Sequence, residues 1–485
     1  MIPGEASAST TVPKVLAQST WGTSHPDNGR SIAIGPGGRI YVAGTTFATG
    51  SSFDQYALIL AYNSSGTLLW QRTWRNDTIG SWASAIAVDP VSGDIYVTGG
   101  STVTGGGGGA SNAFVLKFDS SGNTLWQEHW TALYSRGSAI TVDGSANVYV
   151  AGNTINQFFL LNLDPAGRIV WQLLWTPPLS SYYYDANTLS VDSSGNVYLS
   201  ADTYPSSGYN VDLLKFSPTG SLVWQKTWGG LGSDKAEGGT IDSANHFYVT
   251  GSTTSYIAGS KYPFLLKIDS SGSIVWQKIW VGNCNCSFQA VALDSYGNIY
   301  VAGNAGAWGG GILLLKLDAT SALVWATTWG GEYVQGQNRG MLGSLAVDSA
   351  GNAVITGQIG PPPYALGLPG NSSFRDATFG LTSLTGSVSS ATLPGLPLQG
   401  VTGTPYGSQS YAESDDEFLT IISDSSATNS TNPGPQPTLP SLNGIILYGT
   451  IGVVASALVI LGALIIRRRR KSGSTTPPNG ERLIC

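Results

Sequence analysis

The sequence predicts an all-β fold, a seven-bladed β-propeller of four-stranded blades, followed by a single C-terminal transmembrane helix. Three observations predict it. First, a phrase such as SVDSSGNVYLS (Ser190 to Ser200) recurs at intervals of about fifty residues, a period typical of propellers and solenoids. Second, each copy is followed by an apolar run, a turn and a pair of tryptophans. Third, a segment without charge, Gly444 to Ile466, directly precedes a cluster of basic residues.

Each repeat contains four short runs with strand character. In the fifth unit these are the run into Asp242 and then HFYVTG (246–251), FLLKID (264–269) and SIVWQKIW (273–280). They are rich in β-branched and aromatic residues and are bounded by Gly, Asp, Ser and Asn, as strands and hairpin turns are. The connecting Asp bonds its own backbone and the Gly adopts positive φ. Four antiparallel strands per repeat, with no helical pattern between repeats, favour propeller blades over a solenoid.

The landmark of the second strand gives the number of blades. It occurs seven times, at Tyr41, Tyr96, Tyr149, Tyr198, Tyr248, Tyr300 and, in degenerate form, Val354. The tryptophan that ends the fourth strand occurs at Trp74, Trp130, Trp175, Trp228, Trp280 and Trp329. One more copy, Trp21 in QSTWG, precedes the first blade. We therefore expect Leu16 to Gly22 to close the ring by pairing into the seventh blade, whose own last segment (Thr385 to Thr392) lacks the tryptophan. Closure removes open sheet edges.

The paired tryptophans of each repeat are predicted to be structural. Residues two apart on a strand share a face, so Trp224, Lys226 and Trp228 project together. The two tryptophans are constant, whereas the residue between them varies from repeat to repeat. Large aromatic residues repeated in register are typical of a core, with the middle side chain lying along them. We expect the rings to pack between adjacent blades.

The repeated phrase and the trailing LVWQKTWGG (Leu222 to Gly230) resemble the β-propeller repeat family often labelled SBBP, found in secreted and surface proteins of bacteria and archaea. The resemblance covers about residues 15 to 392. It implies the propeller fold and a surface location, and it says almost nothing about activity. The seventh unit departs from the family pattern, because it reads AVITG (Ala353 to Gly357) and is followed by a Pro-rich insertion at Pro361 to Pro363.

Composition divides the chain into five expected parts. These are a disordered N-terminus (1–14), the propeller (15–392), a Pro/Ser/Thr/Gly-rich stalk (393–443) in which Phe418 to Ile422 is a candidate short strand, the transmembrane helix (444–466) and a basic cytoplasmic tail (467–485). Only 11% of residues are charged, and 64 are Gly, which is typical of extracellular modules. The formal net charge is −6, and the tail contributes six basic residues and one acid, so the rest carries −6 − 5 = −11. Such an acidic outer part excludes nucleic acid as a partner.

The basic cluster sets the expected orientation. Arg467 to Arg470 and Lys471 follow the apolar segment, and basic residues stay on the cytoplasmic side. We therefore expect a single-pass membrane protein with its propeller outside the cell. The residues from Met1 to Lys14 contain no apolar stretch of signal-peptide length, so we expect the true start to lie upstream. A tail-anchored protein with a cytoplasmic propeller is the alternative, and the positive-inside preference opposes it.

No pattern of catalytic or metal-binding residues stands out. The three His lie in different repeats, the repeated Asp belong to turns, and the spacing of a calcium loop is absent. We therefore predict no catalytic residue, no metal site and no cofactor. Cys284 and Cys286 lie in VGNCNCSF, where a strained disulfide and two free loop thiols are equally weighted alternatives.

The functional signal is an asymmetry between two sets of loops. Connections within the first and third hairpins are short, whereas those between the second and third strands and between blades are long, dissimilar and placed on one face by antiparallel topology. Aromatic residues among small polar ones are typical of recognition surfaces. The candidate binding residues are Trp82, Tyr134, Tyr182, Tyr183, Tyr184, Tyr204, Tyr209, Tyr256, Trp308, Tyr333 and Arg339.

These residues lead to three hypotheses about function. The first is a cell-surface binding or adhesion propeller that recognises a glycan, a peptide or an envelope protein through that face. The second is an extracellular propeller enzyme, a polysaccharide lyase or hydrolase, acting at the same face or in the central channel. The third is a purely structural envelope component. Acidic and basic side chains converging from several blades would favour the enzyme, and an aromatic funnel without them would favour binding.

Overall fold

The computed structural model describes a set of ranges separated by short gaps. They are residues 13–22, 27–47, 55–76, 80–102, 110–130, 134–155, 157–176, 185–203, 208–255, 261–281, 286–304, 311–329, 341–359, 373–376, 381–382, 387–389 and 416–423. Apart from one 3-10 turn, η1 (Pro36–Gly38), their regular structure is all β. Across these ranges no helix is long and apolar enough to cross a membrane. The predicted transmembrane segment 444–466, the tail and residues 1–12 lie outside them.

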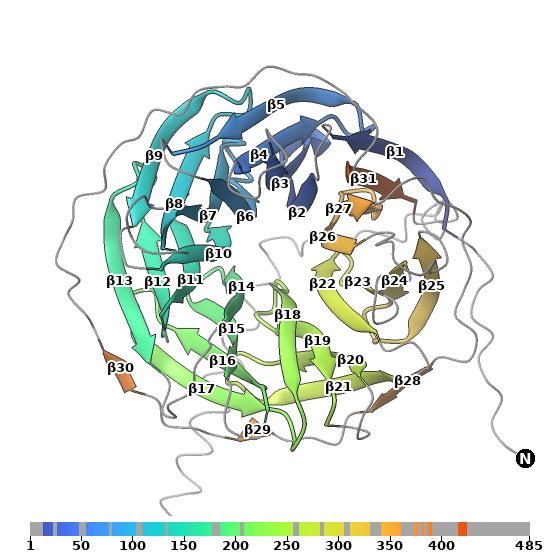
Figure 1. Cartoon of the computed structure of the whole chain (residues 1–485). Coiled ribbons are helices and arrows are strands. Elements are labelled where there is room, and N and C mark those ends of the chain that lie inside the picture. The colour runs from blue at the N-terminus through green and yellow to red at the C-terminus, as the bar shows by residue number, and fades with distance from the viewer. Residues whose placement is uncertain are drawn as a thin grey trace, which may run out of the picture. The chain divides into compact units, whose positions relative to one another are not determined.

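The described strands form seven antiparallel sheets arranged in a ring (Figure 1). Blade 1 consists of β2 (Asn28–Ile34), β3 (Ile40–Phe47), β4 (Gln55–Tyr62) and β5 (Leu68–Trp74). Blade 2 consists of β6 (Ser81–Val88), β7 (Ile95–Thr102), β8 (Ser111–Phe118) and β9 (Thr124–Trp130). Blade 3 consists of β10 (Arg136–Val142), β11 (Val148–Thr154), β12 (Gln157–Leu163) and β13 (Ile169–Thr176). The first strand of each blade is its inner strand.

The remaining blades follow the same order. Blade 4 consists of β14 (Asp185–Val191), β15 (Val197–Thr203), β16 (Asn210–Phe216) and β17 (Leu222–Trp228). Blade 5 consists of β18 (Asp234–Ile241), β19 (Phe247–Thr253), β20 (Tyr262–Ile268) and β21 (Ile274–Val281). Blade 6 consists of β22 (Ser287–Leu293), β23 (Ile299–Asn304), β24 (Ile312–Leu317) and β25 (Leu323–Trp329). The predicted seven-bladed propeller of four-stranded blades is confirmed.

Blade 7 joins both ends of the propeller. Its order is β26 (Met341–Val347), β27 (Ala353–Ile359), β31 (Asp416–Ile422) and β1 (Val15–Trp21), so the N-terminal strand is outermost (Figure 1). The predicted ring closure by the copy that contains Trp21 is confirmed. The third strand is β31, which pairs with β27 on one side and with β1 on the other.

The predicted end of the propeller at residue 392 is therefore too early, because the propeller continues to Ile422. Part of the predicted stalk, 416–422, is a strand of the seventh sheet. Phe418, Leu419, Ile421 and Ile422 are each no more than 3% exposed, so both faces of β31 are buried. A strand covered on both faces reads as a continuous apolar run, and FLTII has that pattern.

Three short strands lie on the outside of the ring. β28 (Ser373–Asp376) pairs with β21, β29 (Leu381–Thr382) with β17, and β30 (Ser387–Ser389) with β13. Following β27, the chain therefore visits blades 5, 4 and 3 in turn along their outer edges (Figure 1). The prediction that Thr385 to Thr392 forms the last strand of blade 7 is wrong, because residues 387–389 pair with blade 3 instead.

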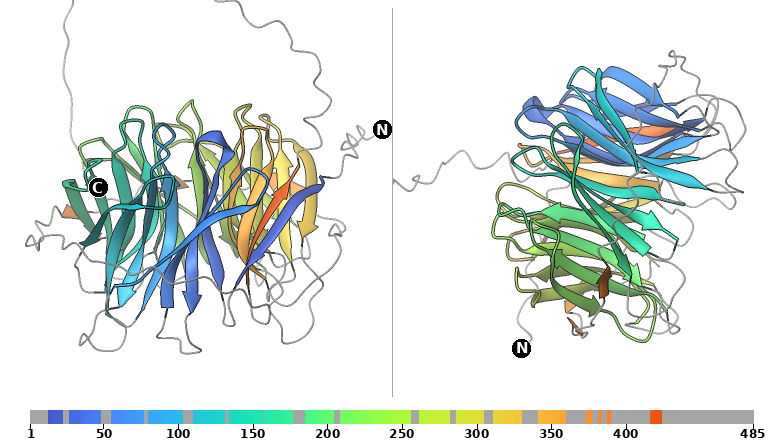
Figure 2. Two further views of the ribbon diagram at one scale, coloured as in Figure 1. Left: turned by 90° about the horizontal axis from the view of Figure 1, so that it is seen from above. Right: turned by 90° about the vertical axis from the view of Figure 1, so that its left-hand side faces the viewer.

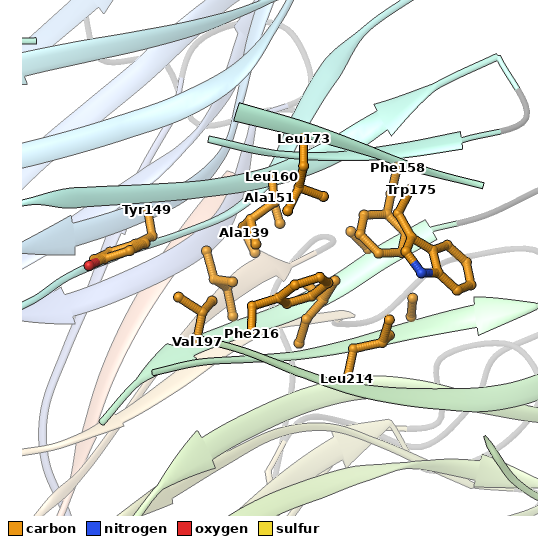
Figure 3. Packing of buried hydrophobic residues seen from close by; sticks show 14 residues of the cluster. Ala139, Tyr149, Ala151, Phe158, Leu160, Leu173, Trp175, Val197, Leu214 and Phe216 are labelled. Atoms are coloured by element: carbon orange, nitrogen blue, oxygen red, sulfur yellow. The ribbon is translucent and has the colours of Figure 1, made fainter. Parts of the chain in front are cut away.

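Most of the core lies between neighbouring blades. The cluster between blades 3 and 4 contains Phe158, Trp175, Val197 and Phe216, all fully buried (Figure 3). The rings of Phe158 and Trp175 stack with centroids 4.8 Å apart. As predicted, the tryptophans pack at these seams.

In several blades the paired tryptophans also make hydrogen bonds across a seam. The first indole donates to a turn carbonyl of the next blade, as Trp224 Nε1 does to Ser270 O at 3.1 Å. The second donates to a Gln side chain of the next blade: Trp21 to Gln71, Trp74 to Gln127, Trp130 to Gln172 and Trp228 to Gln277, at 2.6–3.0 Å. These bonds fix the stagger between blades, because an indole N–H that is buried needs an acceptor.

Removing one of these acceptors tests that role. Gln127→Leu leaves Trp74 Nε1 without its acceptor at the seam between blades 1 and 2, and an unsatisfied buried donor costs about 1–3 kcal/mol. We expect the free energy of unfolding, measured in urea, to fall by about that amount. Leu125→Ala on the same strand is the control, because Leu125 is 51% exposed and its truncation changes little. An unchanged stability in Gln127→Leu would show that the bond is incidental.

The repeated Asp residues organise the turns between first and second strands, as predicted. Asp192 Oδ1 accepts the N–H groups of Ser194 and Asn196, each at 2.9 Å, and Oδ2 accepts from the Asn196 side chain at 2.8 Å. Gly195 has φ 79°, which only Gly adopts without strain. The geometry of the turn thus accounts for this Asp without a ligand.

The seam between blades 3 and 4 departs from the repeat. In each blade, one residue of the third strand pairs with the residue that precedes the terminal tryptophan of the fourth strand. In the six other blades this third-strand residue is apolar: Leu58, Phe114, Phe159, Phe264, Leu313 and Phe418. Blade 4 has Asp212 there, fully buried. Gln225 Nε2 lies 3.4 Å from Asp212 Oδ2, and neither Gln225 Oε1 nor Trp175 Nε1 has a hydrogen-bond partner. The Gln225 side chain thus bonds to this carboxyl group, whereas the equivalent Gln at four other seams accepts from a tryptophan.

Candidate functional site

The inner strands carry a β-bulge at the same place in every blade. In β2 the register shifts between Gly29 and Ser31, and the other six inner strands have the equivalent shift. A bulge leaves one residue unpaired and re-aims its side chain. All seven bulged residues line one central cavity: Arg30, Ser84, Ser138, Asn187, Glu237, Gln289 and Gly343. The ring therefore presents one position from each blade to its axis.

A larger cavity of about 580 Å³ adjoins this ring of side chains. Its wall includes residues at or near the starts of inner strands, namely Asn28, Trp82, Arg136, Lys235 and Met341. We call this end of the cavity the channel mouth. All seven blades contribute residues to this cavity, among them Arg30, Glu237 and Asp202. No single blade contains the site, so ring closure is what assembles it.

Two arginines give the mouth its electrostatic character. The side chains of Arg30 from β2 and Arg136 from β10 are both exposed to the cavity. Surrounding protein lowers the pKa of the Arg30 guanidinium, and the charge of Arg136 lowers it further. Two like charges held near each other oppose each other's ionised state.

The two acids of the cavity are held by the wall. Asp202 is 6% exposed, and its Oδ1 accepts the N–H of Ala236 at 2.8 Å. Glu237 Oε1 accepts from Ser252 Oγ at 3.4 Å and lies 3.9 Å from Lys261 Nζ. Burial raises the pKa of Glu237. Both carboxyl groups are therefore partly engaged by the wall.

Aromatic rings complete the wall. Gly100 lies against one side of Trp82, because a Cβ on Gly100 would come within 2.3 Å of that ring. Trp82 also lines the cavity. Lys235 Nζ lies 3.7 Å from the ring centroid of Tyr209, a cation–π contact that holds this cation at the rim. The mouth thus combines a flat apolar surface with fixed positive charge.

The described ends of the two predicted sets of long loops lie on the same side of the blades as the mouth. Backbone hydrogen bonds join them: Thr102 N–H donates to Gly80 O, Ser135 to Ser111 and Asp234 to Tyr209. Figure 2 shows the strands running between this face and the face of the short turns. Trp82, Tyr134 and Tyr209 are therefore at the mouth's face, and Trp82 lines the cavity itself. The other candidates, Tyr182, Tyr183, Tyr184, Tyr204, Tyr256, Trp308, Tyr333 and Arg339, lie outside the described residues.

Sequence reasoning missed the charged residues of the inner strands. Arg30, Arg136, Lys235 and Glu237 all lie at or near the first residues of these strands, not in the long loops. A signal was available, because charges are rare in this chain and the seven inner strands can be aligned on the landmark that follows each. In that alignment, the variable position before the small residue holds Arg30 and Glu237, and the position two residues earlier holds Arg136 and Lys235.

Cysteine and histidine contribute little to the mouth. Cys286 is fully buried and disulfide-bonded, and the predicted partner Cys284 lies outside the described residues. Burial against Trp74 lowers the pKa of His129, whereas His246 hydrogen-bonds to Asp242 within a turn. In the part of the chain that the structure covers, no group of three His, Cys, Asp or Glu is arranged to hold a metal ion.

No protein-family model matches the chain, and neither does any curated protein. Among solved structures, a protein of unknown function from Bacteroides caccae is 12% identical, with TM-score 0.39 over 56% of this chain and 89% of that one. A protein from Lactobacillus plantarum is 13% identical, with TM-score 0.40 over 61% and 84%. Chaetomium thermophilum Raptor is 8% identical, with TM-score 0.46 over 77% of this chain and 29% of Raptor. Similarities at these TM-scores are too weak to bear on function.

Proposed function

We propose that this propeller is a binding protein that takes its ligand at the channel mouth. The observation that carries the proposal is the convergence of residues from all seven blades on one cavity of about 580 Å³. That volume suits a small molecule or the end of a chain-like ligand. Fixed cations, an aromatic wall and uncharged polar groups supply several kinds of contact within one site.

Trp82 is the residue to test first, because its ring forms part of the wall without bridging two blades. A central, well-supported tryptophan typically dominates a binding site. For a ligand found by glycan and peptide arrays with the full chain, we expect Trp82→Ala to weaken binding at least about tenfold. Tyr296→Ala is the control, since Tyr296 is 81% exposed in a turn on the opposite face. Equal binding by wild type and Trp82→Ala, or loss in the control alone, would overturn the proposed site.

An enzyme is the second candidate, and one observation favours it. Acidic and basic side chains do converge from several blades, since Glu237 lies in the same cavity as Lys235 and Arg136. Burial raises the pKa of Glu237, as a general acid requires. Incubating the full chain with the bound glycan and analysing products by mass spectrometry separates the two functions. Cleavage lost in Glu237→Gln would establish the enzyme, and intact glycan would support binding alone.

We also propose that the propeller is displayed outside the cell on a membrane anchor. The support comes from the sequence: the uncharged segment 444–466 and the basic residues after it, which favour an internal C-terminus. A glycan or protein of the cell's surroundings is then the natural ligand class. Protease treatment of intact cells tests this orientation, because an exposed propeller is cleaved and an internal one is protected.

A further inference from the structure

We propose that the outer edges of blades 3, 4 and 5 form a docking surface for an extended peptide, and that β28, β29 and β30 occupy this surface as a detachable strap. These strands add a fifth strand to blades 5, 4 and 3 (Figure 1). The partner that the surface fits is an extended peptide with apolar residues seven positions apart. The surface lies on the outside of the ring, so it does not depend on the ligand of the channel mouth.

The connection that carries the strap is not needed to join the strands on either side of it. β27 ends at Ile359 and β31 begins at Asp416, and these residues are register partners in one antiparallel pair. The equivalent partners in blade 3 are Thr154 and Gln157, and only two residues separate them. Paired strand ends of this kind are joined by a tight hairpin turn. Residues 360–415 are therefore an insertion into a hairpin, and the pairing of the strap with other blades requires a separate reason.

The strap repeats in step with the blades. In three successive blades the terminal tryptophan of the fourth strand has an apolar register partner in the strap: Phe374 for Trp280, Leu381 for Trp228 and Val388 for Trp175. These partners follow one another at intervals of seven residues. Seven residues of extended chain span up to about 25 Å, so one interval carries the chain from the edge of one blade to the next. A segment that docks on several blades is expected to have such a period.

The contacts of the strap are of the kind that can be exchanged. The outer strand of a sheet presents N–H and C=O groups that accept another strand, and main-chain hydrogen bonds then supply the affinity. β28 has four residues, β29 two and β30 three, so each contact is small and the three act together through their linkage. β31, in contrast, is buried on both faces. The strap is thus held by the propeller without being part of its core.

Charge favours one register for the strap. Asp376 is the register partner of Lys278 on blade 5. Opposite charges at directly paired positions stabilise an antiparallel pair, and like charges destabilise it. The residue equivalent to Lys278 in blade 2 is Glu128, two positions before Trp130. The acidic residue of the strap therefore suits blade 5 and opposes blade 2. Among the described strands, none pairs with the outer edge of blade 2.

Two variants of the full chain remove the strap. In one, an Asn-Gly turn replaces residues 360–415, and in the other a Gly/Ser linker of the same length replaces them. We expect both to keep the cooperative unfolding transition of the wild type, measured by circular dichroism, because β27 and β31 still form a hairpin. Loss of that transition in both variants would make the connection part of the fold and would overturn the inference.

A fluorescent peptide of residues 371–392 then tests the docking surface, with fluorescence anisotropy as the readout. We expect it to bind the strapless variants and to bind the wild type at least about tenfold more weakly, because there the linked strap competes at high effective concentration. A peptide of scrambled sequence is the control. Absence of binding to a folded strapless variant, or equal binding to the wild type, would contradict the proposed surface.

A charge exchange locates the peptide on blade 5. In a strapless variant, Lys278→Glu should weaken binding of the peptide about fivefold, and a peptide with Asp376→Lys should regain the loss. The control is Leu125→Glu, which introduces the same charge on the outer strand of blade 2, where Leu125 is 51% exposed. We expect this control to bind the peptide as its parent does. Affinities that respond to neither change at positions 278 and 376 would show that the peptide docks elsewhere and would overturn the inference.

Discussion

A chain that ends at residue 415 is expected to lose the cooperative unfolding transition that a chain ending at Ala427 retains. β31 contributes four buried apolar side chains, Phe418, Leu419, Ile421 and Ile422. Truncating one such side chain to Ala typically costs about 2–5 kcal/mol, so losing four exceeds the usual stability of a domain. Thermal unfolding followed by circular dichroism and tryptophan fluorescence measures the difference.

Two further contacts make the loss larger. β1 pairs with β31 and with no other described strand, so removing β31 also frees the N-terminal closure. Glu417, fully buried, accepts hydrogen bonds from Tyr62 Oη at 3.1 Å and from Thr356 Oγ1 at 2.7 Å. The longer chain ends at the boundary of the compact unit 1–427 and is the control. If both chains melted at the same temperature, β31 would not be part of the folded propeller.

The second large effect concerns Asp212 at the seam between blades 3 and 4. Burial raises the pKa of its carboxyl to about 7 from the ordinary 3.8, although Thr227 and Gln225 hydrogen-bond to it. Because the folded-state value is the higher one, its contribution is present in full below pH 3.8 and is lost as pH rises through 7. Between pH 5 and pH 8 we expect the wild type to lose about 3 kcal/mol through this group.

Asp212→Asn removes that proton and should remove most of the pH dependence. Urea unfolding at pH 5 and pH 8 measures it: the variant is expected to be more stable than wild type at pH 8, by about the amount lost by the wild type. Asp119→Asn is the control. Hydrogen bonds from Asn123 and Ser121 lower the pKa of Asp119, so its replacement leaves the difference between pH 5 and pH 8 intact. A variant with the full wild-type pH dependence would show that Asp212 is not the titrating group.

Local landmarks in the sequence predicted much of this fold. The Asp turns, the tryptophan pairs and the extra copy at Trp21 each belong to a hairpin or strand of a few residues, so each leaves its own pattern. β31 was predicted only as a candidate short strand of the stalk, because it follows β27 after a long connection and has no hairpin turn beside it to assign it to a blade. The strands β28, β29 and β30 were not predicted, because pairing at the outer edge of a blade requires backbone groups alone and leaves no alternating side-chain pattern in the sequence.

The site was less accessible to sequence reasoning than the fold. Alternation along a strand assigns side chains to two faces, but Arg30 and Glu237 reach the axis through bulges, which change that assignment. Asp202 joins the cavity from a second strand. The lengths of the loops in the sequence identified the face that carries the long loops. The charged residues of the mouth, in contrast, come together only because the seven inner strands meet at one axis.

The account depends most on ligand binding at the mouth, and blocking that opening tests it most directly. In a chain carrying Cys485→Ser, Met341→Cys places a thiol at the mouth, where Met341 is 43% exposed, and Tyr296→Cys places one on the opposite face. Each is coupled to a maleimide polyethylene glycol, and binding of the ligand found by the glycan and peptide arrays is measured. We predict that coupling at position 341 abolishes binding and that coupling at position 296 leaves it unchanged. Binding that persists with the mouth blocked would contradict the account.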